Sequence, residues 1–265
     1  CVDNWQITYE GKDKRMIIEL DGFCDSGLER QENQDHIFMA QNDDGALGVL
    51  ADGMGGYRNG GEASKILCDY FSKWWNEADR CEKKNGFTII MDELEIVLKD
   101  ANAKIFSQFG CNELCGTTAL VFWIEAGRWG LLCVGDSRCY QMQNGLLRKK
   151  MVQQSIDDVW EKQAVVKKQY SRKKRQEHPN YGKLTCAVGA EVAICYHRIE
   201  GFVRKKELFC LCSDGVYRYC EPDVFEDSCT DAWTQELKQC LEQISANVYE
   251  HGAPDNLSAI MIKVQ

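Results

Sequence analysis

The stretch Ala51-Asp52-Gly53-Met54-Gly55-Gly56 decides how the rest of the chain is interpreted. It follows the apolar run 46–50, which predicts a buried strand, so the turn is expected to present Asp52 at the end of that strand. Glycines on both sides of Met54 allow a bend that residues with a Cβ avoid, and they let a carbonyl group or a phosphate approach closely. An acid at a strand end suits a hard cation, although an Asp-Gly pair alone is more typical of an ordinary turn.

The composition is that of a globular protein, and we expect one domain over residues 1–265 because no linker-like segment divides the chain. No apolar run reaches the roughly 18 residues that span a bilayer, and no signal-peptide pattern opens the chain, so we expect no membrane segment and a cytoplasmic location. The chain starts at Cys1 rather than Met, which is also compatible with a catalytic piece of a longer protein. The net charge of -9 argues against nucleic acid as a partner, because phosphate backbones attract basic surfaces.

The 15 cysteines do not follow the spacing of a disulfide framework or of a zinc site. There is no Cys-x-x-Cys, and the histidines are scattered at His36, His178, His197 and His251. Many cysteines lie inside apolar runs, which predicts small buried hydrophobic residues in a reducing compartment.

Hydrophobic periodicity predicts an α+β chain with antiparallel strands. Helical stripes of apolar residues run over 63–74, 94–105 and 233–248. Strands are predicted at 16–23, 36–40, 46–50, 117–124, 129–134, 139–142, 207–212 and 257–264. Short turns at 126–127 and 144–145 join successive strands as hairpins, the second ending at 146–147, and hairpins produce antiparallel sheets.

Residues 153–183 stand apart from this pattern, because the composition turns polar and six basic residues lie between Lys167 and Arg175. A run of charge is typical of a solvated face. The alternative is a flap over the substrate site that attracts acidic phosphopeptides.

Aspartates recur at the edges of the predicted strands, at Asp52, Asp136, Asp214 and Asp255. If those edges meet at one end of the β-core, the cluster offers only oxygen ligands, which suit Mg²⁺ or Mn²⁺ better than zinc or copper. Two such ions about 3.5 to 4 Å apart can share a water molecule, lower its pKa and hold a phosphoryl group for attack. Arg30 would supply a bidentate fork for phosphate oxygens.

Seven short motifs in this order resemble those of the metal-dependent Ser/Thr protein phosphatases of type 2C, especially their compact bacterial branch. The resemblance covers essentially the whole chain. Its motifs are Arg30-x-x-Asn33-Gln34-Asp35, Asp52-Gly53-Met54-Gly55-Gly56, Gly116-Thr117-Thr118, Val134-Gly135-Asp136-Ser137-Arg138, Leu184-Thr185 with Val188-Gly189, Cys212-Ser213-Asp214-Gly215 and Asp255-Asn256.

The resemblance implies a four-layer α-β-β-α sandwich of two antiparallel sheets flanked by helices. It also implies a hydrolase that removes phosphate from phosphoserine and phosphothreonine, using a water activated at a binuclear Mg²⁺ or Mn²⁺ centre. In that family pattern Asp52 bridges both ions, the Gly53 carbonyl binds one, and Asp214 and Asp255 hold the other. Asp35 would act through metal-bound water, Arg30 would bind the substrate phosphate, and 153–183 would be the family's variable flap.

Three positions depart from the family pattern. Gln34 replaces a common Glu, which removes a negative charge near the metals and is expected to weaken metal affinity. Met54 stands where animal members carry a histidine proposed as general acid, so leaving-group protonation is expected to fall to water. Arg218 stands where many members have an aspartate for a third ion. We therefore expect a two-metal core, with Asp136 alone unable to hold a third ion tightly.

The predicted function is that of a monomeric signalling phosphatase whose partners are phosphoproteins, opposing a cytoplasmic Ser/Thr kinase. The alternative is a catalytically weak or silent relative that binds phosphoproteins as a regulatory module. The set Asp52, Asp214 and Asp255 argues against this alternative, whereas Gln34 and Arg218 leave room for it. A nucleotide-binding protein is disfavoured because no Gly-rich phosphate-binding element opens a helix.

Overall fold

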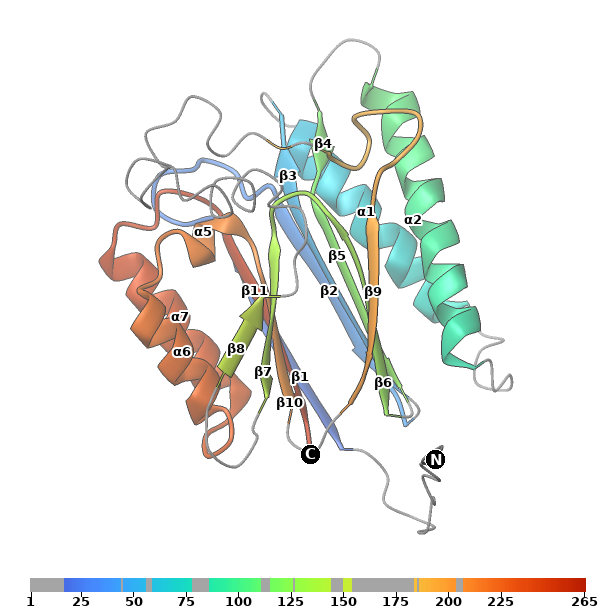
Figure 1. Ribbon diagram of the computed structural model, residues 1–265. Coiled ribbons are helices and arrows are strands. Elements are labelled where there is room, and N and C mark those ends of the chain that lie inside the picture. The colour runs from blue at the N-terminus through green and yellow to red at the C-terminus, as the bar shows by residue number, and fades with distance from the viewer. Residues whose placement is uncertain are drawn as a thin grey trace, which may run out of the picture.

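Two antiparallel β-sheets pack face to face between two helical layers (Figure 1). The structure is a computed structural model that describes residues 17–43, 45–55, 59–77, 86–110, 115–125, 127–143, 150–153, 184, 186–203 and 207–265. In these residues, sheet A has the strand order β1 (Ile18–Asp25), β11 (Leu257–Val264), β10 (Glu207–Cys212), β7 (Arg138–Gln143) and β8 (Lys150–Gln153). Sheet B has the order β2 (Asp35–Gln41), β3 (Gly45–Met54), β5 (Ala119–Glu125), β6 (Arg128–Val134) and β9 (His197–Phe202), with the short β4 (Gly116–Thr117) paired to β3.

The alternation of side chains along β3 shows why the sheets stack. Ala46 and Leu50 point between the sheets, whereas Leu47 and Val49 point to the helices on the other face, and all four are fully buried. In the layer between the sheets, Phe122 of sheet B packs against Phe209 of sheet A, with ring centroids 4.6 Å apart. A strand that is buried on both faces has a continuous apolar sequence, and residues 46–50 show this pattern.

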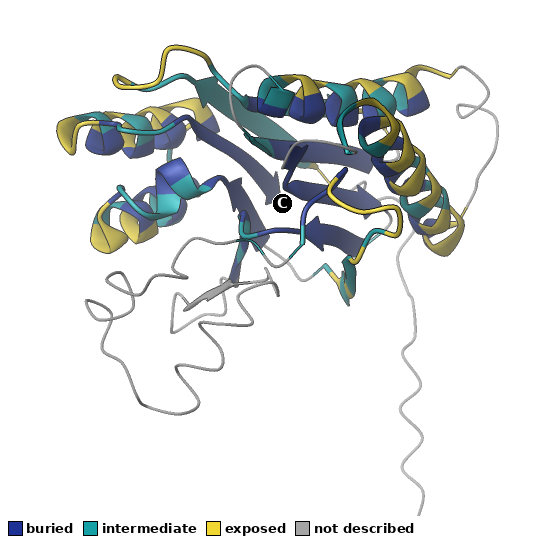
Figure 2. Ribbon diagram, turned by 90° about the horizontal axis from the view of Figure 1, so that it is seen from above, coloured by how far each residue is buried: buried dark blue, intermediate teal, exposed yellow. Residues whose placement is uncertain are grey.

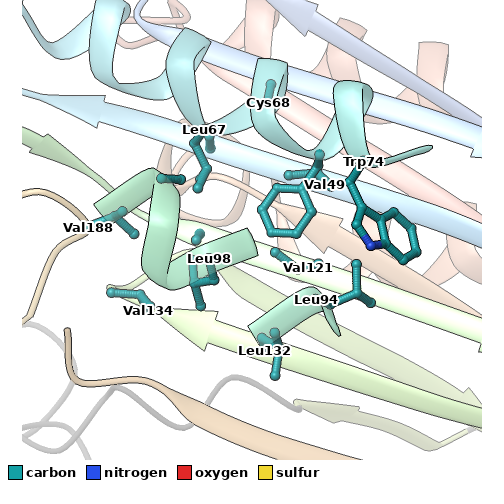
Figure 3. Packing of buried hydrophobic residues seen from close by; sticks show 14 of the residues in the cluster. Val49, Leu67, Cys68, Trp74, Leu94, Leu98, Val121, Leu132, Val134 and Val188 are labelled. Atoms are coloured by element: carbon teal, nitrogen blue, oxygen red, sulfur yellow. The ribbon is translucent and has the colours of Figure 1, made fainter. Parts of the chain in front are cut away.

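Helices cover the outer face of each sheet. Sheet B is covered by α1 (Asn59–Asn76) and α2 (Phe87–Phe109), and Figure 3 shows Leu67, Leu94 and Leu98 packed over Val49 and Val121. Sheet A is covered by α6 (Pro222–Asp231) and α7 (Leu237–Glu250), with the one-turn helix α5 (Asp214–Tyr217) at its end. Figure 2 shows that the exposed residues of these helices lie on the outside of the molecule. The predicted α-β-β-α sandwich is confirmed.

Strand β3 runs further than its apolar pattern predicts. Gly53 pairs with Thr117 and Met54 with Gly116, so the strand continues to Met54. The prediction that Asp52 follows the end of a strand is therefore wrong, because Asp52 lies within β3. The predicted strand 117–124 is likewise divided at Thr118 into β4 and β5.

The first predicted hairpin is confirmed, whereas in the second Gln143 pairs with Lys150 and not with residue 146, as the predicted turn at 144–145 requires, and the two hairpins lie in different sheets. Strand β6 pairs with β5 in sheet B, and β7 pairs with β8 in sheet A, so the turn 135–137 carries the chain from one sheet to the other. The second strand of the later hairpin begins at Lys150, while 146–147 lies outside the described residues.

Within the described residues, the sequence pattern does not predict three further elements: β9, α5 and α6. The apolar stripe 233–248 predicts Trp233 in the last helix, but this helix begins at Leu237. Of the predicted flap, 154–183 lies outside the described residues. None of the helices described combines the length and the apolarity needed to cross a bilayer.

Candidate metal centre

The aspartates picked out from the sequence gather at one end of the two sheets. In sheet A, β1 ends at Asp25 opposite Leu257, and β10 ends at Cys212 opposite Arg138. Just beyond these pairs lie Asp136 in the turn before β7, Asp214 at the start of α5 and Asp255 in the segment before β11. In sheet B, β2 begins at the same end with Asp35. The end lies at the top of Figure 1, beside α5 and β4.

Asp35 and Asp52 are direct cross-strand partners in the antiparallel pair β2–β3. Side chains of residues that face each other in this way lie on the same face of a sheet, about 5 Å apart at Cβ. The register of one hairpin thus brings two carboxylates together, and Asp35 is 2% exposed.

Two threonines fix the backbone at Asp52. The Asp52 amide donates to Thr118 Oγ1 at 3.0 Å, while the Thr118 amide and Thr117 Oγ1 donate to the Asp52 carbonyl at 2.8 and 3.0 Å. Thr118 Oγ1 is also 2.7 Å from Ser137 Oγ, in the turn that carries Asp136. The Gly116-Thr117-Thr118 motif therefore positions the backbone of Asp52.

Asp35 is held by hydroxyl groups of sheet A. Ser258 Oγ donates to Asp35 Oδ2 at 2.7 Å, and the Ser258 amide donates to Ser213 Oγ at 3.0 Å. Since Asp35 belongs to sheet B and Ser258 to sheet A, this buried contact ties the two sheets together at the site.

Asp255 accepts a bidentate pair from Arg30. Arg30 Nη2 lies 3.0 Å from Asp255 Oδ2 and Nε lies 2.9 Å from Oδ1. The arginine side chain is 57% exposed, so it forms the rim of the site. The sequence-based hypothesis that Arg30 faces the same end as the carboxylates agrees with this placement.

Asn256 anchors the loop that carries Arg30. Its Nδ2 donates to the carbonyls of Ser26 and Glu32 at 2.9 and 3.1 Å, and its Oδ1 accepts from the Gln34 amide at 2.9 Å. The side chain is 7% exposed. These three hydrogen bonds of the Asn256 side chain all go to the loop that carries Arg30. They therefore hold this loop next to Asp255, the residue that precedes Asn256.

Arg218 bridges the other two aspartates. Its Nη1 lies 3.0 Å from Asp214 Oδ2 and its Nη2 lies 3.0 Å from Asp136 Oδ2. Tyr217 donates a further hydrogen bond to Asp136 Oδ2 at 3.2 Å. Arg218 follows α5 directly, four residues after Asp214, so a single helical turn brings the guanidinium back over the carboxylate.

Gly53 is required by close packing of backbone. A Cβ at this position would lie 2.3 Å from the Gly60 carbonyl oxygen and 2.6 Å from the Gln34 carbonyl oxygen. Any side chain here would therefore push apart the start of α1 and the loop before β2. The close approach inferred from the glycines of this motif is present at Gly53, while Gly56 lies outside the described residues.

Burial and mutual repulsion raise the pKa values of these carboxylates. Burial is the larger cause for Asp35, with a pKa of about 7, and for Asp214, with a pKa of about 6; neighbouring aspartates add to both shifts. The pKa of Asp52 is raised well above its usual range by burial and then by the charges of Asp35 and Asp214. Burial also raises the pKa of Asp136, although the charge of Arg218 opposes that shift. Ionising the cluster is thus costly unless a cation joins it.

The donor set fits a hard divalent cation in its chemistry. Asp35, Asp52, Asp214 and Asp255 offer only oxygen atoms, and their shared charge is the kind that two Mg²⁺ or Mn²⁺ ions neutralise. Within the described part of the chain, no three Asp, Glu, His or Cys side chains already stand around one point as metal ligands. Rotation of Asp255 away from Arg30 would therefore accompany metal binding.

Sequence reasoning missed the residues that hold the site together. The roles of Thr118, Ser213, Ser258 and Tyr217 depend on contacts between distant parts of the chain, which no local spacing reveals. The motif Asp255-Asn256 assigns no role to Asn256, although an asparagine beside a candidate ligand is a signal for a buried side chain that uses its hydrogen bonds to hold the site.

Comparisons of the sequence with known proteins all point to the same family. A sequence model of the family described as Protein phosphatase 2C matches residues 29–259. The serine/threonine phosphatase stp of Listeria welshimeri is 26% identical over 244 residues, covering 90% of this chain and 93% of that protein. The serine/threonine protein phosphatase PstP of Mycobacterium tuberculosis is 24% identical, and the match covers 94% of this chain and 45% of that protein.

Solved structures share the fold. The S. agalactiae serine/threonine phosphatase superposes with a TM-score of 0.79 at 22% identity, covering 93% of this chain and 99% of that chain. The catalytic domain of PstP, solved in complex with two manganese ions, superposes with a TM-score of 0.77 at 21% identity, covering 94% and 99%. At this identity the likeness establishes the common sandwich.

Proposed function

The chain belongs to the protein phosphatase 2C family, and from that premise we propose that it hydrolyses phosphoserine and phosphothreonine monoesters in proteins with the help of two Mg²⁺ or Mn²⁺ ions. The observation that carries the proposal is the meeting of Asp35, Asp52, Asp214 and Asp255 at one end of the sandwich, with Arg30 at the rim. A phosphate monoester is a dianion, so a site for it needs cations that the protein's own carboxylates can hold.

The metal ligands in this proposal are Asp52, the Gly53 carbonyl, Asp214 and Asp255. Two bound ions would lower the pKa of a water molecule and neutralise charge on the phosphoryl group. The chain itself fixes Asp52 through Thr117 and Thr118 before any ion arrives. Such preorganisation reduces the reorganisation needed when the reaction takes place.

Arg30 binds the substrate phosphate. Its fork already holds a carboxylate in bidentate geometry, and the same geometry suits two phosphate oxygens. The hydrogen bond to Asp255 and then its charge raise the pKa of Arg30, and an arginine stays positive at working pH even without that partner. When Asp255 turns toward a metal ion, the exposed arginine is released toward the substrate.

Asp35 orients the water molecule. Ser258 donates to its Oδ2, which fixes the rotation of the carboxyl group in a buried position beside Asp52. Burial raises the pKa of Asp35 in the metal-free protein, and cations bound beside it would favour the ionised carboxylate, which can accept a hydrogen bond from the water.

The substrates are, in this proposal, cytoplasmic proteins phosphorylated by a Ser/Thr kinase. The cysteines that the structure describes are all free thiols, and most are buried among apolar side chains. A reducing compartment keeps cysteines in that state.

A second candidate is a weak or silent relative that binds phosphoproteins. The observation in its favour is that Arg30 and Arg218 already form ion pairs with Asp255 and Asp214. In that case phosphate binding would persist without turnover.

Hydrolysis of p-nitrophenyl phosphate and of a phosphothreonine peptide tests the two candidates. The assays are run with Mn²⁺, with Mg²⁺ and with chelator, on the wild type and on Asp214→Asn. We expect metal-dependent turnover that falls more than about 100-fold in the variant, because even residues that only support metal ligands change activity by about 10- to 100-fold.

The matched control is Asp227→Asn, a change of the same chemistry on the exposed face of α6. It should keep wild-type turnover. Equal turnover in Asp214→Asn would refute the proposed site, whereas phosphopeptide binding without turnover in the wild type would favour the regulatory module.

A further inference from the structure

Arg218 occupies the space between two carboxylates that could otherwise share a cation. Asp136 comes from the turn between β6 and β7, and Asp214 begins α5. One guanidinium contacts both, with each N–O distance at 3.0 Å. The three side chains are 24%, 17% and 18% exposed, so the contact is screened from bulk water more than a surface ion pair.

The positive charges around Asp136 come from side chains of the protein itself. Tyr217 and Arg218 both donate to its Oδ2. The guanidinium of Arg138 stacks on the ring of Tyr217, 3.7 Å from its centroid, and thereby places a second positive charge next to this aspartate. A divalent ion entering here would have to displace Arg218 and would meet repulsion from Arg138.

Arg218 keeps its charge in this position. Burial by itself would lower the pKa of the guanidinium, but the charges of Asp214 and Asp136 outweigh this and hold its pKa above the usual range. An arginine is therefore a permanent monovalent cation here, one that neither dissociates nor depends on the metal concentration.

Building on the proposed function, we propose that the Arg218 guanidinium replaces a third metal ion, so that the protein binds two divalent ions and holds Asp136 and Asp214 in place with its own side chain. Arg218 is a positioning residue, because it acts on Asp214 and not on the substrate. Arg218→Asp should open a third metal site by exchanging a fixed cation for a third carboxylate.

Counting bound ions tests the proposal directly. We would measure Mn²⁺ stoichiometry by equilibrium dialysis with metal analysis, and by native mass spectrometry, for the wild type, Arg218→Asp and Arg218→Ala. The wild type should bind two ions, and both variants should bind three, more tightly in Arg218→Asp. In Arg218→Ala, millimolar guanidinium chloride should fill the vacated space and weaken only the third site.

Arg198→Asp is the matched control. Arg198 also pairs with several carboxylates, Asp92, Glu95 and Glu200, but on the α2–β9 side of the molecule. The Arg198→Asp substitution should leave the number of bound Mn²⁺ ions at two, although it removes an ion-pair network of similar size.

The outcomes separate this inference from the proposed function. A wild type with three ions, or variants of Arg218 with no more ions than the wild type, would overturn the inference alone. A wild type that binds no Mn²⁺ would overturn the proposed function and the inference together. The wild-type count needs no variant to fold, so the test does not depend on the stability of Arg218→Asp.

Discussion

At the scale of single residues, the site depends on carboxylates that are buried close to one another. Asp35 and Asp52 face each other across a β-ladder, and Asp214 adds its charge to both. Each group is harder to ionise in the folded protein than in the unfolded chain. The metal-free protein should therefore respond to pH in a way that reports on this cluster.

The first prediction concerns stability against pH without metal. The pKa of Asp35 is raised from 3.8 to about 7 and that of Asp214 to about 6, so the folded protein holds protons that the unfolded chain has already released. Their stabilising contribution is complete below the unfolded value of 3.8 and is lost as the pH rises through 6 and 7. We expect the chelator-treated protein to lose thermal stability across this window, as measured by circular dichroism.

The Asp35→Asn variant separates the effect of this cluster on the pH dependence of stability from the effect of the other titrating groups. Its melting temperature should decline less than that of the wild type over the same pH range. Mn²⁺ should stabilise the wild type increasingly as the pH rises, because ions compete with protons for the carboxylates. Parallel curves for the wild type and Asp35→Asn would contradict the assignment of the raised pKa to this residue.

The identity of the charged residues could be predicted from the sequence, but their ion pairs could not. Asp52, Asp136, Asp214 and Asp255 each stand beside a turn residue, which is a local signal. The contact between Arg218 and Asp136 joins residues 82 positions apart. It depends on how α5 meets the turn 135–137, which no spacing in the sequence specifies.

At the scale of elements, the loop before β2 must be held against the start of β11. Asn256 makes its contacts to Ser26, Glu32 and Gln34, and the Leu28 amide donates to the Ala253 carbonyl at 2.9 Å. Ala253 has φ of 35°, an uncommon value for a residue with a Cβ. The chain thus accepts local strain in the segment that brings Asp255 to the site.

Asn256→Ala should loosen this loop. Losing its side-chain hydrogen bonds leaves buried partners unsatisfied, which costs about 1–3 kcal/mol for such a group. We expect a lower urea midpoint together with a higher KM for the phosphothreonine peptide, because Arg30 lies in the same loop.

Asn256→Asp is the matched variant for this prediction. It keeps an acceptor for the Gln34 amide but loses the donors to Ser26 and Glu32, and it adds a negative charge beside Asp255. It should be impaired in the same direction. Unchanged KM and stability in both variants would show that the loop is held by other contacts.

The elements themselves were predicted unevenly. Strand β11 has the predicted bounds because its apolar run is continuous, whereas β3 extends four residues into the glycine motif through its pairing with β2 and β4. Strand β9 was missed because its exposed and half-buried residues give no clear alternation. Helix α6 was missed because it is short and acidic, with few buried residues.

At the scale of the whole molecule, the site exists only if the two sheets stay together. Phe122 lies at the centre of that interface, fully buried against Phe209 and stacked near Trp129. The class of fold could be predicted from hairpins and helical stripes. The division of strands between sheets could not, because a turn that continues one sheet and a turn that crosses to another look alike in sequence.

Phe122→Ala should lower the free energy of unfolding by about 3–5 kcal/mol, the usual cost of deleting a buried phenyl ring. Chemical denaturation with tryptophan fluorescence measures this. Phe202→Ala is the matched control, since Phe202 is 74% exposed and its loss should cost far less. Similar losses in the two variants would mean that the interface between the sheets is not the main core.

The most direct test of the central claim is the position of bound metal in a crystal soaked in Mn²⁺, determined by anomalous scattering. We predict two manganese peaks among Asp52, Asp214 and Asp255, with the Gly53 carbonyl as a further ligand and no peak between Asp136 and Asp214. Manganese bound elsewhere, or no peak within coordination distance of Asp52, would contradict the account.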